Sequence, residues 1–228
     1  AAADGRTVYW MMGRMAHLQA LDWTAQLGRP VPVINDAQAA LVAEVWLGAA
    51  KGARNVVLLT LGTGVGGAII CDGHLLRGTL GRAGHLGHIT VNPDGPLDIV
   101  RTPGSLEHAI GNYSIAERSL GRFQSTHELL QAAAKGDLHA QEVWQRSVKA
   151  LAAALSGIIN AVDPELVILG GGIAQAEAQL FDPLNAFLDQ FEWRPHDHRV
   201  RLLRAVGGEF TGALGAAREA MGSGQVDG

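Results

Sequence analysis

The feature that most constrains this fold is a glycine-rich turn between two apolar runs. Residues 56–61 read Val-Val-Leu-Leu-Thr-Leu, then Gly62-Thr63-Gly64-Val65-Gly66-Gly67 follow, and a second apolar run ends at Cys71. Runs of this length that are rich in leucine and β-branched residues are typical of buried strands. Glycine permits a tight turn that a side chain would obstruct, so the pattern predicts a β-hairpin. Bare backbone N–H groups beside the Thr63 hydroxyl would also suit phosphate oxygens. An ordinary hairpin without a ligand is the alternative.

Short apolar runs and helical patterns alternate along the rest of the chain. Apolar spacing of three and four predicts helices, and brief β-branched runs between turn residues predict strands. Helices are expected at 15–27, 37–50, 114–120, 126–134, 137–162, 181–191 and 212–221, with others starting after Ser105 and at Ile173, and extended segments at 7–10, 30–34, 89–91, 167–169 and 199–204. This alternation, together with one hairpin, predicts an α/β protein with mixed sheets.

The composition limits the kind of protein. The 228 residues are 47% hydrophobic with a net charge of −4, which suits one large domain or two small lobes. A nucleic-acid binder would carry a basic face, so we expect no nucleic-acid partner. The single cysteine, Cys71, excludes an internal disulfide and a multi-cysteine zinc site, and we expect it to be buried. No apolar run reaches the roughly 18 residues of a spanning helix, and residues 1–7 do not resemble a signal peptide. These features predict a cytoplasmic protein.

Polar residues stand where short strands are expected to end. Asn35 and Asp36 follow the apolar run 30–34 and precede an alanine-rich helical segment. A carboxylate facing a cleft at this position suits a general base. The alternative is that Asp36 caps the helix, because an Asn or Asp side chain accepts a hydrogen bond from an unpaired N–H of the first turn.

Two further glycine-rich segments carry candidate ligand contacts. Gly170-Gly171-Gly172 follows a predicted strand, and glycines there let a phosphate or planar ligand approach the backbone. Tight packing between strand and helix is the alternative. Gly78, Gly81 and Gly84 keep the backbone open before His85-Leu86-Gly87-His88, so two histidines stand beside a bend with no room for side chains.

The motifs resemble one protein family in their order. They are Asn35-Asp36-Ala37, Gly62-Thr63-Gly64-Val65-Gly66, Ala83-Gly84-His85-Leu86-Gly87-His88, Gly104-Ser105-Leu106-Glu107 and Val167-Ile168-Leu169-Gly170-Gly171-Gly172. This set resembles the ROK family (repressors, open reading frames, kinases), whose enzymes are glucokinases and other hexose or N-acetylhexosamine kinases. The resemblance covers nearly the whole chain. It implies an actin-like, ribonuclease H-like ATPase fold with two lobes around a cleft, and we expect a dimer. Residues 1–35 with 212–228 would form the remnant of an incomplete small lobe, and 36–211 the large sugar-binding and catalytic lobe.

The resemblance also implies roles for single residues. Asp36 matches the general base that takes the proton from the sugar hydroxyl. The turn at 62–64 would face the ATP phosphates, and Gly170, Gly171 and Gly172 would lie near the adenosine. Phosphoryl transfer depends on positioning and charge neutralisation, and Mg²⁺ would supply that charge. We expect Asp36 and the turn to face each other across one cleft. The expected substrate-binding residues are Asn35, Gly84, His85, His88 and Glu107.

Two departures concern the sugar and the metal. The family pattern Glu-x-Gly-His is His85-Leu86-Gly87-His88 in this chain, so an imidazole replaces a glutamate that contacts the sugar, and the preferred sugar stays open. The family's zinc cysteines align with Asp98, Val100 and Ser105. Because no thiolate is left, we expect no structural zinc, and we expect packing and hydrogen bonds to hold the loop 95–105 instead. A residual metal site on His88 and Asp98 is the alternative.

A third departure concerns the phosphate grip. The family carries an Asp-x-Gly-Gly-Thr loop well upstream of the residues that match Asn35 and Asp36. Asp4-Gly5-Arg6-Thr7 is similar but lies too near Asp36, and we interpret it as a turn. We therefore expect either a fragment or a protein without half of its phosphate grip, with weak or no kinase activity on its own.

These features lead to one expected function and its alternatives. We expect an ATP-dependent kinase that phosphorylates a hydroxyl of a glucose-like hexose. Polyphosphate remains open as the donor, because relatives that use it also lack the cysteine cluster. The alternatives are a sugar-responsive transcription regulator of the same family and a non-catalytic sugar-binding pseudokinase.

Overall fold

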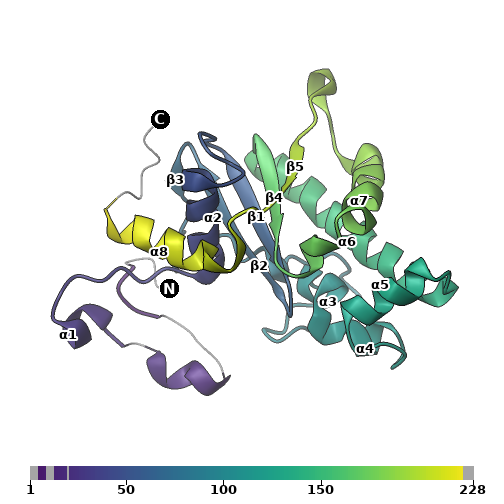
Figure 1. The fold of residues 1–228 in the computed structure, drawn as a ribbon, viewed down its shortest axis with the longest axis horizontal. Coiled ribbons are helices and arrows are strands. Elements are labelled where there is room, and N and C mark those ends of the chain that lie inside the picture. Colours follow the sequence, from purple (N-terminus) through teal and green to yellow (C-terminus); the bar gives the residue numbers. More distant parts are fainter. Residues whose placement is uncertain (1–4, 9–12, 20, 223–228) are drawn as a thin grey trace. The chain divides into compact units, whose positions relative to one another are not determined.

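The computed structural model describes residues 5–8, 13–19 and 21–222 (Figure 1). The expected extended segment 7–10 lies partly outside these residues. The chain divides into two compact units: unit 1 is Ala1–Leu58, Gly67–His85 and Ala205–Gly228, and unit 2 is Leu59–Gly66 and Leu86–Arg204. Compact units are not functional lobes, so the expected division into 1–35 with 212–228 and 36–211 stays a prediction.

Helices and strands alternate along the chain. The α-helices are α1 (Trp23–Leu27), α2 (Asp36–Leu47), α3 (Leu106–Ile110), α4 (Ile115–Arg118), α5 (Thr126–Ala134), α6 (Leu138–Val162), α7 (Ala178–Phe191) and α8 (Thr211–Ala220). The strands are β1 (Val56–Leu61), β2 (Val65–Cys71), β3 (His74–Leu75), β4 (Leu166–Gly170) and β5 (Arg201–Arg204). Short 3₁₀ helices lie at Gly13–Leu18, Leu86–His88, Asn112–Ser114, Ile173–Ala176, Pro195–Asp197 and Gly208–Phe210.

The strands form one mixed sheet in the order β3-β2-β1-β4-β5. β2 and β3 pair antiparallel with Cys71 opposite His74, whereas β4 and β5 pair parallel with Leu166 opposite Arg201. Nearly all residues of β1, β2 and β4 are buried, which explains why their sequences are almost continuously apolar. The predicted α/β class with a mixed sheet is confirmed.

In unit 1, α2 packs along α8 (Figure 1). Asn35 begins α2: its side-chain oxygen accepts hydrogen bonds from the N–H groups of Ala37 and Gln38, and the Gln38 side chain accepts one from the Asn35 N–H. This capping box satisfies donors that the first helical turn leaves unpaired. The two helices approach closely at Gly215, where an added Cβ would lie 1.7 Å from the Ala39 carbonyl oxygen.

Glu44 joins the end of α2 to the segment that precedes α8. Its side chain is buried, and Oε1 accepts hydrogen bonds from the N–H groups of Val206 and Gly207 at 2.9 and 2.8 Å. Oε2 accepts a third from Ala49 N–H at 2.8 Å. A buried carboxylate is tolerated where such donors replace its lost hydration, so Glu44 holds three backbone segments together.

In unit 2, the long helix α6 packs against α3, α5 and α7. The Asp137 side chain caps its start by accepting a hydrogen bond from Ala140 N–H, and Asp163 ends it in the left-handed conformation. Buried residues recur along one face, among them Trp144, Leu151 and Leu155. The helix predicted at 137–162 is therefore confirmed, as is the helix predicted at 126–134.

Three local predictions are wrong. The segment 30–34 forms no strand, because Pro30 and Pro32 carry no N–H for a ladder. Residues 89–91 form no strand either, and Thr90 makes a single bridge to Ser105. The segment 15–27 is not one helix. Its first residues belong to the 3₁₀ helix Gly13–Leu18, and its last five residues, Trp23–Leu27, form α1.

Cys71 is exposed rather than buried. It is the last residue of β2, directly before the turn at Asp72 and Gly73, and the burial of the strand ends with it. The prediction from residue type was therefore wrong, because the end of a strand at a surface turn decides the environment of its final side chain.

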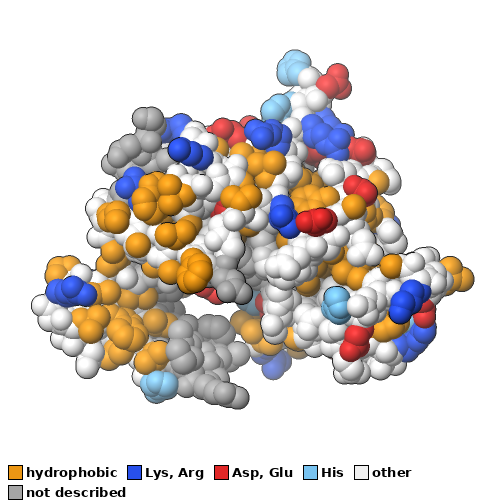
Figure 2. Space-filling view, viewed as in Figure 1, with side chains coloured by type: hydrophobic (Ala, Val, Ile, Leu, Met, Phe, Trp, Pro, Cys, Tyr) orange, Lys and Arg blue, Asp and Glu red, His pale blue; other side chains and the backbone are white. Residues whose placement is uncertain are grey.

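The surface charge is mixed. On the face shown in Figure 2, Lys and Arg side chains are interspersed with Asp and Glu side chains, in line with the small net charge of −4. Within the described ranges, no helix is both long and apolar enough to cross a membrane.

Candidate functional site

Two of the predicted ligand-binding loops line one cavity in unit 2. Gly62 and Thr63, from the turn between β1 and β2, and Gly172, which follows β4, border a cavity of about 670 Å³. Most of the remaining lining comes from α5 and from the 3₁₀ helix Ile173–Ala176. A volume of this size suits a small-molecule ligand. The structure thus brings together two segments that are more than a hundred residues apart in the sequence.

The turn itself is fixed by backbone hydrogen bonds. Gly62 N–H donates to the Gly64 carbonyl at 2.9 Å. The expectation that this N–H has no hydrogen-bond partner is therefore wrong. The carbonyl groups of Gly62 and Thr63 accept hydrogen bonds from the N–H groups of Asn112 and Tyr113 at 2.9 and 3.0 Å. The 3₁₀ helix Asn112–Ser114 therefore holds the turn through its carbonyl groups. These hydrogen bonds fix the direction of the remaining N–H groups of the turn.

Glu107 also holds the turn. It lies on α3 with an exposed fraction of 8%, and its Oε2 accepts a hydrogen bond from Val65 N–H at 2.9 Å. An added Cβ on Gly64 would lie 2.3 Å from the same oxygen, although Gly64 has an ordinary negative φ. Gly64 thus needs to be glycine, because Glu107 occupies the space that a side chain at position 64 would need.

The Tyr113 hydroxyl lies near several acidic groups. Burial and the charges of Glu107, Asp98 and Glu117 raise the pKa of this hydroxyl to about 12.

The three glycines after β4 have different roles. Gly171 has a φ of +83°, and an added Cβ would lie 2.3 Å from the Leu61 carbonyl oxygen, so it packs tightly against β1. Gly172 has open space at its Cβ position and lines the cavity, whereas Gly170 is the last residue of β4. The tight-packing alternative therefore holds for Gly171, whereas a ligand contact at Gly172 stays a prediction. The helix expected from Ile173 is a 3₁₀ helix of four residues.

His88 is held by Asp98. The distance between His88 Nδ1 and Asp98 Oδ2 is 2.8 Å, and the Asp98 side chain is fully buried. A carboxylate only accepts, so His88 Nδ1 carries the hydrogen that is shared. Among the described residues no hydrogen bond occupies His88 Nε2, which leaves this atom for a ligand. The 26% exposure of the His88 side chain is compatible with such access.

Asp98 also holds the loop 95–105. Its Oδ1 accepts hydrogen bonds from the N–H groups of Val100 and Thr102 at 3.0 and 2.8 Å. Burial disfavours ionisation of Asp98, but hydrogen bonds from His88, Thr102, Ser105 and Val100 outweigh it, and the pKa of its carboxyl is lowered. The prediction that hydrogen bonds hold this loop is confirmed.

These residues do not fit a zinc ion. Val100 has no donor atom, and both Asp98 oxygens already accept hydrogen bonds within the loop. In the part of the chain that the structure describes, no three His, Cys, Asp or Glu side chains gather as metal ligands. Ser105 instead caps α3 by accepting a hydrogen bond from His108 N–H, as its sequence position predicts.

The remaining predicted site residues lie in unit 1. Asn35, not Asp36, is the N-cap of α2, so the alternative role predicted for Asp36 is wrong. Asp36 is exposed, and its Oδ1 accepts a hydrogen bond from Ala37 N–H at 2.8 Å. Gly84 has a φ of +85°, and an added Cβ would lie 3.0 Å from Ala68 Cα, so the bend has no room for a side chain. His85 is exposed and donates from Nδ1 to the Arg82 carbonyl at 2.9 Å.

The predicted site residues are thus divided between the two units. Unit 2 contains His88, Glu107 and the two glycine segments, and unit 1 contains Asn35, Asp36, Gly84 and His85. The expected juxtaposition of Asp36 with the turn at 62–64 stays a prediction. The contributions of Val65 N–H and of the α5 wall were not predicted, because neither has a distinctive sequence pattern.

The chain is similar to proteins named as sugar kinases. It is 38% identical over 175 residues to a glucokinase from Thermotoga maritima, covering 69% of this chain and 55% of that protein. It is 33% identical over 214 residues to an N-acetylmannosamine kinase from Citrobacter koseri, covering 92% of this chain and 72% of that protein. The chain therefore spans about half the length of the first of these relatives.

Solved structures show the same fold. A ROK family glucokinase from Streptomyces griseus in complex with glucose and AMPPNP matches with a TM-score of 0.77 and 28% identity, covering 97% of this chain and 78% of that chain. A ROK family transcriptional regulator, a homologue of the E. coli MLC protein, matches with a TM-score of 0.80 and 26% identity, covering 97% and 60%. The fold is the actin-like ATPase fold of the ROK sugar kinases. The model of the ROK family matches residues 19–221, and this chain therefore belongs to the ROK family.

Proposed function

We propose that this chain is the sugar-binding and catalytic part of a kinase that transfers a phosphoryl group from ATP to a hydroxyl of a glucose-like hexose. The observation that carries this proposal is the arrangement around the turn at 62–64. One side of the turn borders the 670 Å³ cavity with Gly172, and Glu107 binds the Val65 N–H at its end. The glucokinase and N-acetylmannosamine kinase relatives support the reaction class.

Three of the proposed sugar-binding residues share one physical property: the side chain is anchored through one polar atom and presents another. Asn35 uses its side-chain oxygen as a helix cap and keeps its amide NH₂ as a donor. Glu107 uses Oε2 on Val65 and keeps Oε1, and His88 uses Nδ1 on Asp98 and keeps Nε2. Side chains that are fixed before the ligand arrives lose little entropy on binding. Polar groups of this kind reject a substrate that lacks the matching hydroxyl.

Asp36 serves as the general base. It is exposed in the first turn of α2, where its carboxylate can accept a proton from a sugar hydroxyl. The N–H groups of Thr63 and Gly64 are the turn's donors toward the ATP phosphates, since those of Gly62 and Val65 are already used. Mg²⁺ bound with the nucleotide would neutralise phosphate charge. Gly172 also lines the cavity, and the open space at its Cβ position leaves room for the nucleotide.

The preferred sugar depends on His85. An imidazole stands where the family pattern has a glutamate, so one acceptor toward the sugar is replaced by a group that can also donate. We propose glucose as the first substrate to test and N-acetylmannosamine as its competitor, because relatives of both kinds match this chain. A cytoplasmic homodimer remains the expected state of the protein.

Calorimetry and a coupled assay test the proposal. Titration with glucose, N-acetylmannosamine and AMPPNP measures binding, and ADP release measures turnover with ATP, with polyphosphate as the competing donor. We expect a sugar and AMPPNP both to bind, and the turnover of ATP to be weak. Asp36→Asn should lower that turnover by about 10²- to 10⁴-fold with little effect on sugar binding. The control is Asp182→Asn, which removes an exposed carboxylate on α7.

The outcomes separate the alternatives. Binding of sugar and AMPPNP together with Asp36-dependent turnover supports the kinase. Binding of sugar without AMPPNP binding or turnover favours the regulator or the non-catalytic sugar-binding protein over the kinase. If neither ligand binds at millimolar concentration, the proposed function is wrong.

A further inference from the structure

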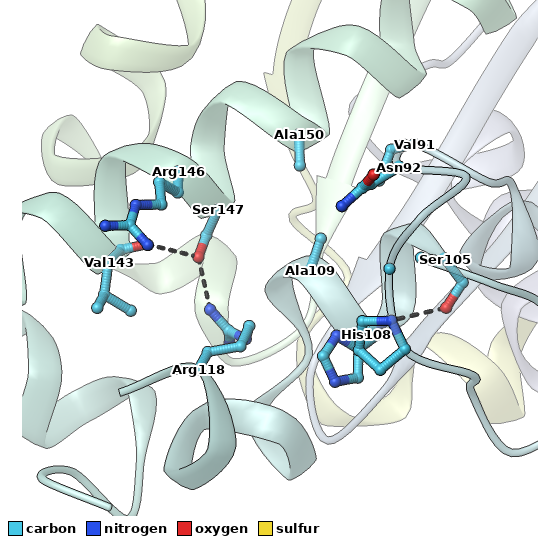
Figure 3. A pocket seen from close by; sticks show the side chains of 13 residues that line it. Val91, Asn92, Ser105, His108, Ala109, Arg118, Val143, Arg146, Ser147 and Ala150 are labelled. Carbon is cyan, nitrogen blue, oxygen red and sulfur yellow. Dashed lines mark hydrogen bonds between the residues drawn. The ribbon is translucent and has the colours of Figure 1, made fainter. Parts of the chain in front are cut away.

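A second cavity in unit 2 is separate from the proposed kinase site. Its volume is about 440 Å³, and it lies among the loop 91–96, α3, the end of α4 and the middle of α6 (Figure 3). No residue to which we assign a substrate or nucleotide contact lines it. A cavity of this size can hold a small metabolite, so the groups on its wall indicate which chemistry it would accept.

The wall contains a cation whose hydrogen bonds all go to neutral acceptors. Arg118 donates from Nε to Ser114 Oγ at 3.0 Å, from Nη1 to Ser147 Oγ at 2.6 Å and from Nη2 to the Gly111 carbonyl at 3.0 Å. All three acceptors are neutral, and among the described residues no carboxylate lies within ion-pair distance of Arg118. Burial lowers the pKa of Arg118 to about 10, and the opposing charge of Glu117, an exposed carboxylate that pairs with His108, offsets only part of this effect. The guanidinium is still charged at neutral pH.

A partly buried charge with no carboxylate in direct contact is unfavourable, because three neutral hydrogen bonds replace only part of its hydration. A guanidinium has five N–H groups, and the three hydrogen bonds of Arg118 leave two of them. Figure 3 shows Arg118 reaching from α4 toward Ser147 on α6, at the edge of the cavity. An anion in the cavity would supply the missing charge.

Two other groups on the wall can bind the same anion. Arg146, directly before Ser147 on α6, pairs with Glu142 one turn earlier, and both side chains are exposed. Such a surface pair contributes little to stability, so Arg146 can exchange it for a ligand. Asn92 accepts a hydrogen bond from Asp94 N–H at 3.2 Å with Oδ1, which leaves its amide NH₂ as a donor. Figure 3 shows the Asn92 amide directed into the cavity.

The rest of the wall is apolar. Ala109 on α3, Val143 and Ala150 on α6, and Val91 on the loop supply apolar lining (Figure 3). His108 also borders the cavity, but its Nε2 lies 3.2 Å from the Glu117 carboxylate, so it already has a partner. The cavity thus combines donors for an anion with a surface for a carbon skeleton, and its volume exceeds what a bare inorganic anion requires.

We propose that this cavity binds a small phosphorylated metabolite, with the phosphate against Arg118, Arg146 and the Asn92 amide and the carbon body against Ala109, Val143 and Ala150. Two guanidinium groups and an amide match the charge and the several acceptor oxygens of a phosphate ester. The proposal does not depend on the kinase function, because the two sites share no assigned residue.

Calorimetry and methyl NMR test the proposal with glucose 6-phosphate, inorganic phosphate and glucose as probes. Glucose 6-phosphate should bind and shift the methyl signals of Ala109 and Ala150, inorganic phosphate should do so more weakly, and glucose should not. The titration is repeated with saturating glucose and AMPPNP, which occupy the proposed kinase site, and the same methyl shifts should persist. Higher salt should weaken the binding, since it screens the charges.

Variants assign the effect to the two cations. Arg146→Ala and Arg118→Lys should each weaken binding of glucose 6-phosphate by about tenfold, the usual loss for a charged hydrogen bond. Glu142→Ala removes the partner of Arg146 but not its charge, so the affinity should be kept or rise. Arg122→Ala removes an exposed arginine that pairs with Asp137 outside the cavity, and it should change nothing.

Three results would overturn the proposal. They are no measurable binding of glucose 6-phosphate at millimolar concentration, methyl shifts that bypass Ala109 and Ala150, and equal affinity in the wild type and both cation variants. Arg118→Lys and Arg146→Ala are preferred to truncation of Arg118, because truncation would also remove the hydrogen bonds to Ser114, Ser147 and Gly111. Urea unfolding of each variant shows that a lost signal is not lost folding.

Discussion

The Glu107 carboxylate accepts a hydrogen bond from the backbone N–H of Val65 at 2.9 Å, and the two residues are 42 positions apart in the sequence. This contact ties α3 to the end of the glycine turn. It explains why position 64 is glycine, since a Cβ there would lie 2.3 Å from the Glu107 oxygen. A predicted sugar-binding residue thus also shapes the predicted phosphate loop.

The first prediction contrasts two glycines of this turn. Gly64→Ala should displace Glu107 from Val65 N–H and destabilise the fold by about 1–3 kcal/mol, because a buried donor loses its acceptor. Gly62→Ala is the control, since its Cβ position has no atom within 4 Å and its backbone φ is not left-handed. Urea unfolding of both variants measures the difference. Equal loss of stability in the two would show that Glu107 does not select glycine at position 64.

The second prediction concerns acid stability. The pKa of Asp98 is lowered from its ordinary value of 3.8, so the unfolded chain binds its proton at a higher pH than the folded chain does. Asp98 therefore stabilises the fold above about pH 4, and this contribution is lost as the pH falls below that value through the folded pKa. Asp98→Asn should be less stable than the wild type at pH 7 and should lose less stability between pH 5 and 2.

Urea unfolding as a function of pH measures both effects. Asp94→Asn is the control, because Asp94 is exposed directly before the loop 95–105. Parallel stability profiles for the wild type and Asp98→Asn would argue against an ionised Asp98 as the anchor of the loop. His88 offers a second readout: its Nδ1–H signal in nitrogen-correlated NMR should shift in Asp98→Asn, since its acceptor changes from a carboxylate to an amide.

The third prediction tests the close contact between α2 and α8. Gly215→Ala would place a Cβ 1.7 Å from the Ala39 carbonyl oxygen, so the helices must separate, and a cost of about 1–3 kcal/mol is expected. Gly212→Ala in the same helix meets no atom within 4 Å and should be neutral or stabilising by up to about 1 kcal/mol, because alanine favours helix. Thermal unfolding compares the two, and a similar melting temperature for both would contradict the packing described.

The fourth prediction concerns the buried carboxylate of Glu44. Glu44→Ala leaves the N–H groups of Ala49, Val206 and Gly207 without their acceptor, and a loss of about 3–5 kcal/mol is expected. Glu44→Gln keeps a carbonyl oxygen for part of this network and should lose less. Hydrogen exchange of Val206 and Gly207 should accelerate in both variants. Unchanged exchange at these two amides would mean that Glu44 does not hold the segment before α8.

Local sequence patterns determined the elements whose signals lie within a few residues. Asp137 and Asp163 mark the two ends of α6, Ser105 caps α3, and the apolar runs around the glycine turn became β1 and β2. These succeeded because a cap, a helical repeat and a buried strand are each decided by neighbouring residues. The order of the glycine and histidine motifs was sufficient to identify the ROK family, which the comparison confirms.

The tertiary structure decided which atoms of the predicted residues are already used. No local pattern shows that Glu107 would bind Val65 N–H, that both oxygens of Asp98 would serve one loop, or that Arg118 would lie beside a cavity without a carboxylate. The exposure of Cys71 also depended on where the chain turns. The physical reason is that a hydrogen bond between residues distant in the sequence depends on how the chain packs. A local sequence pattern reports only interactions between residues that are close in the sequence.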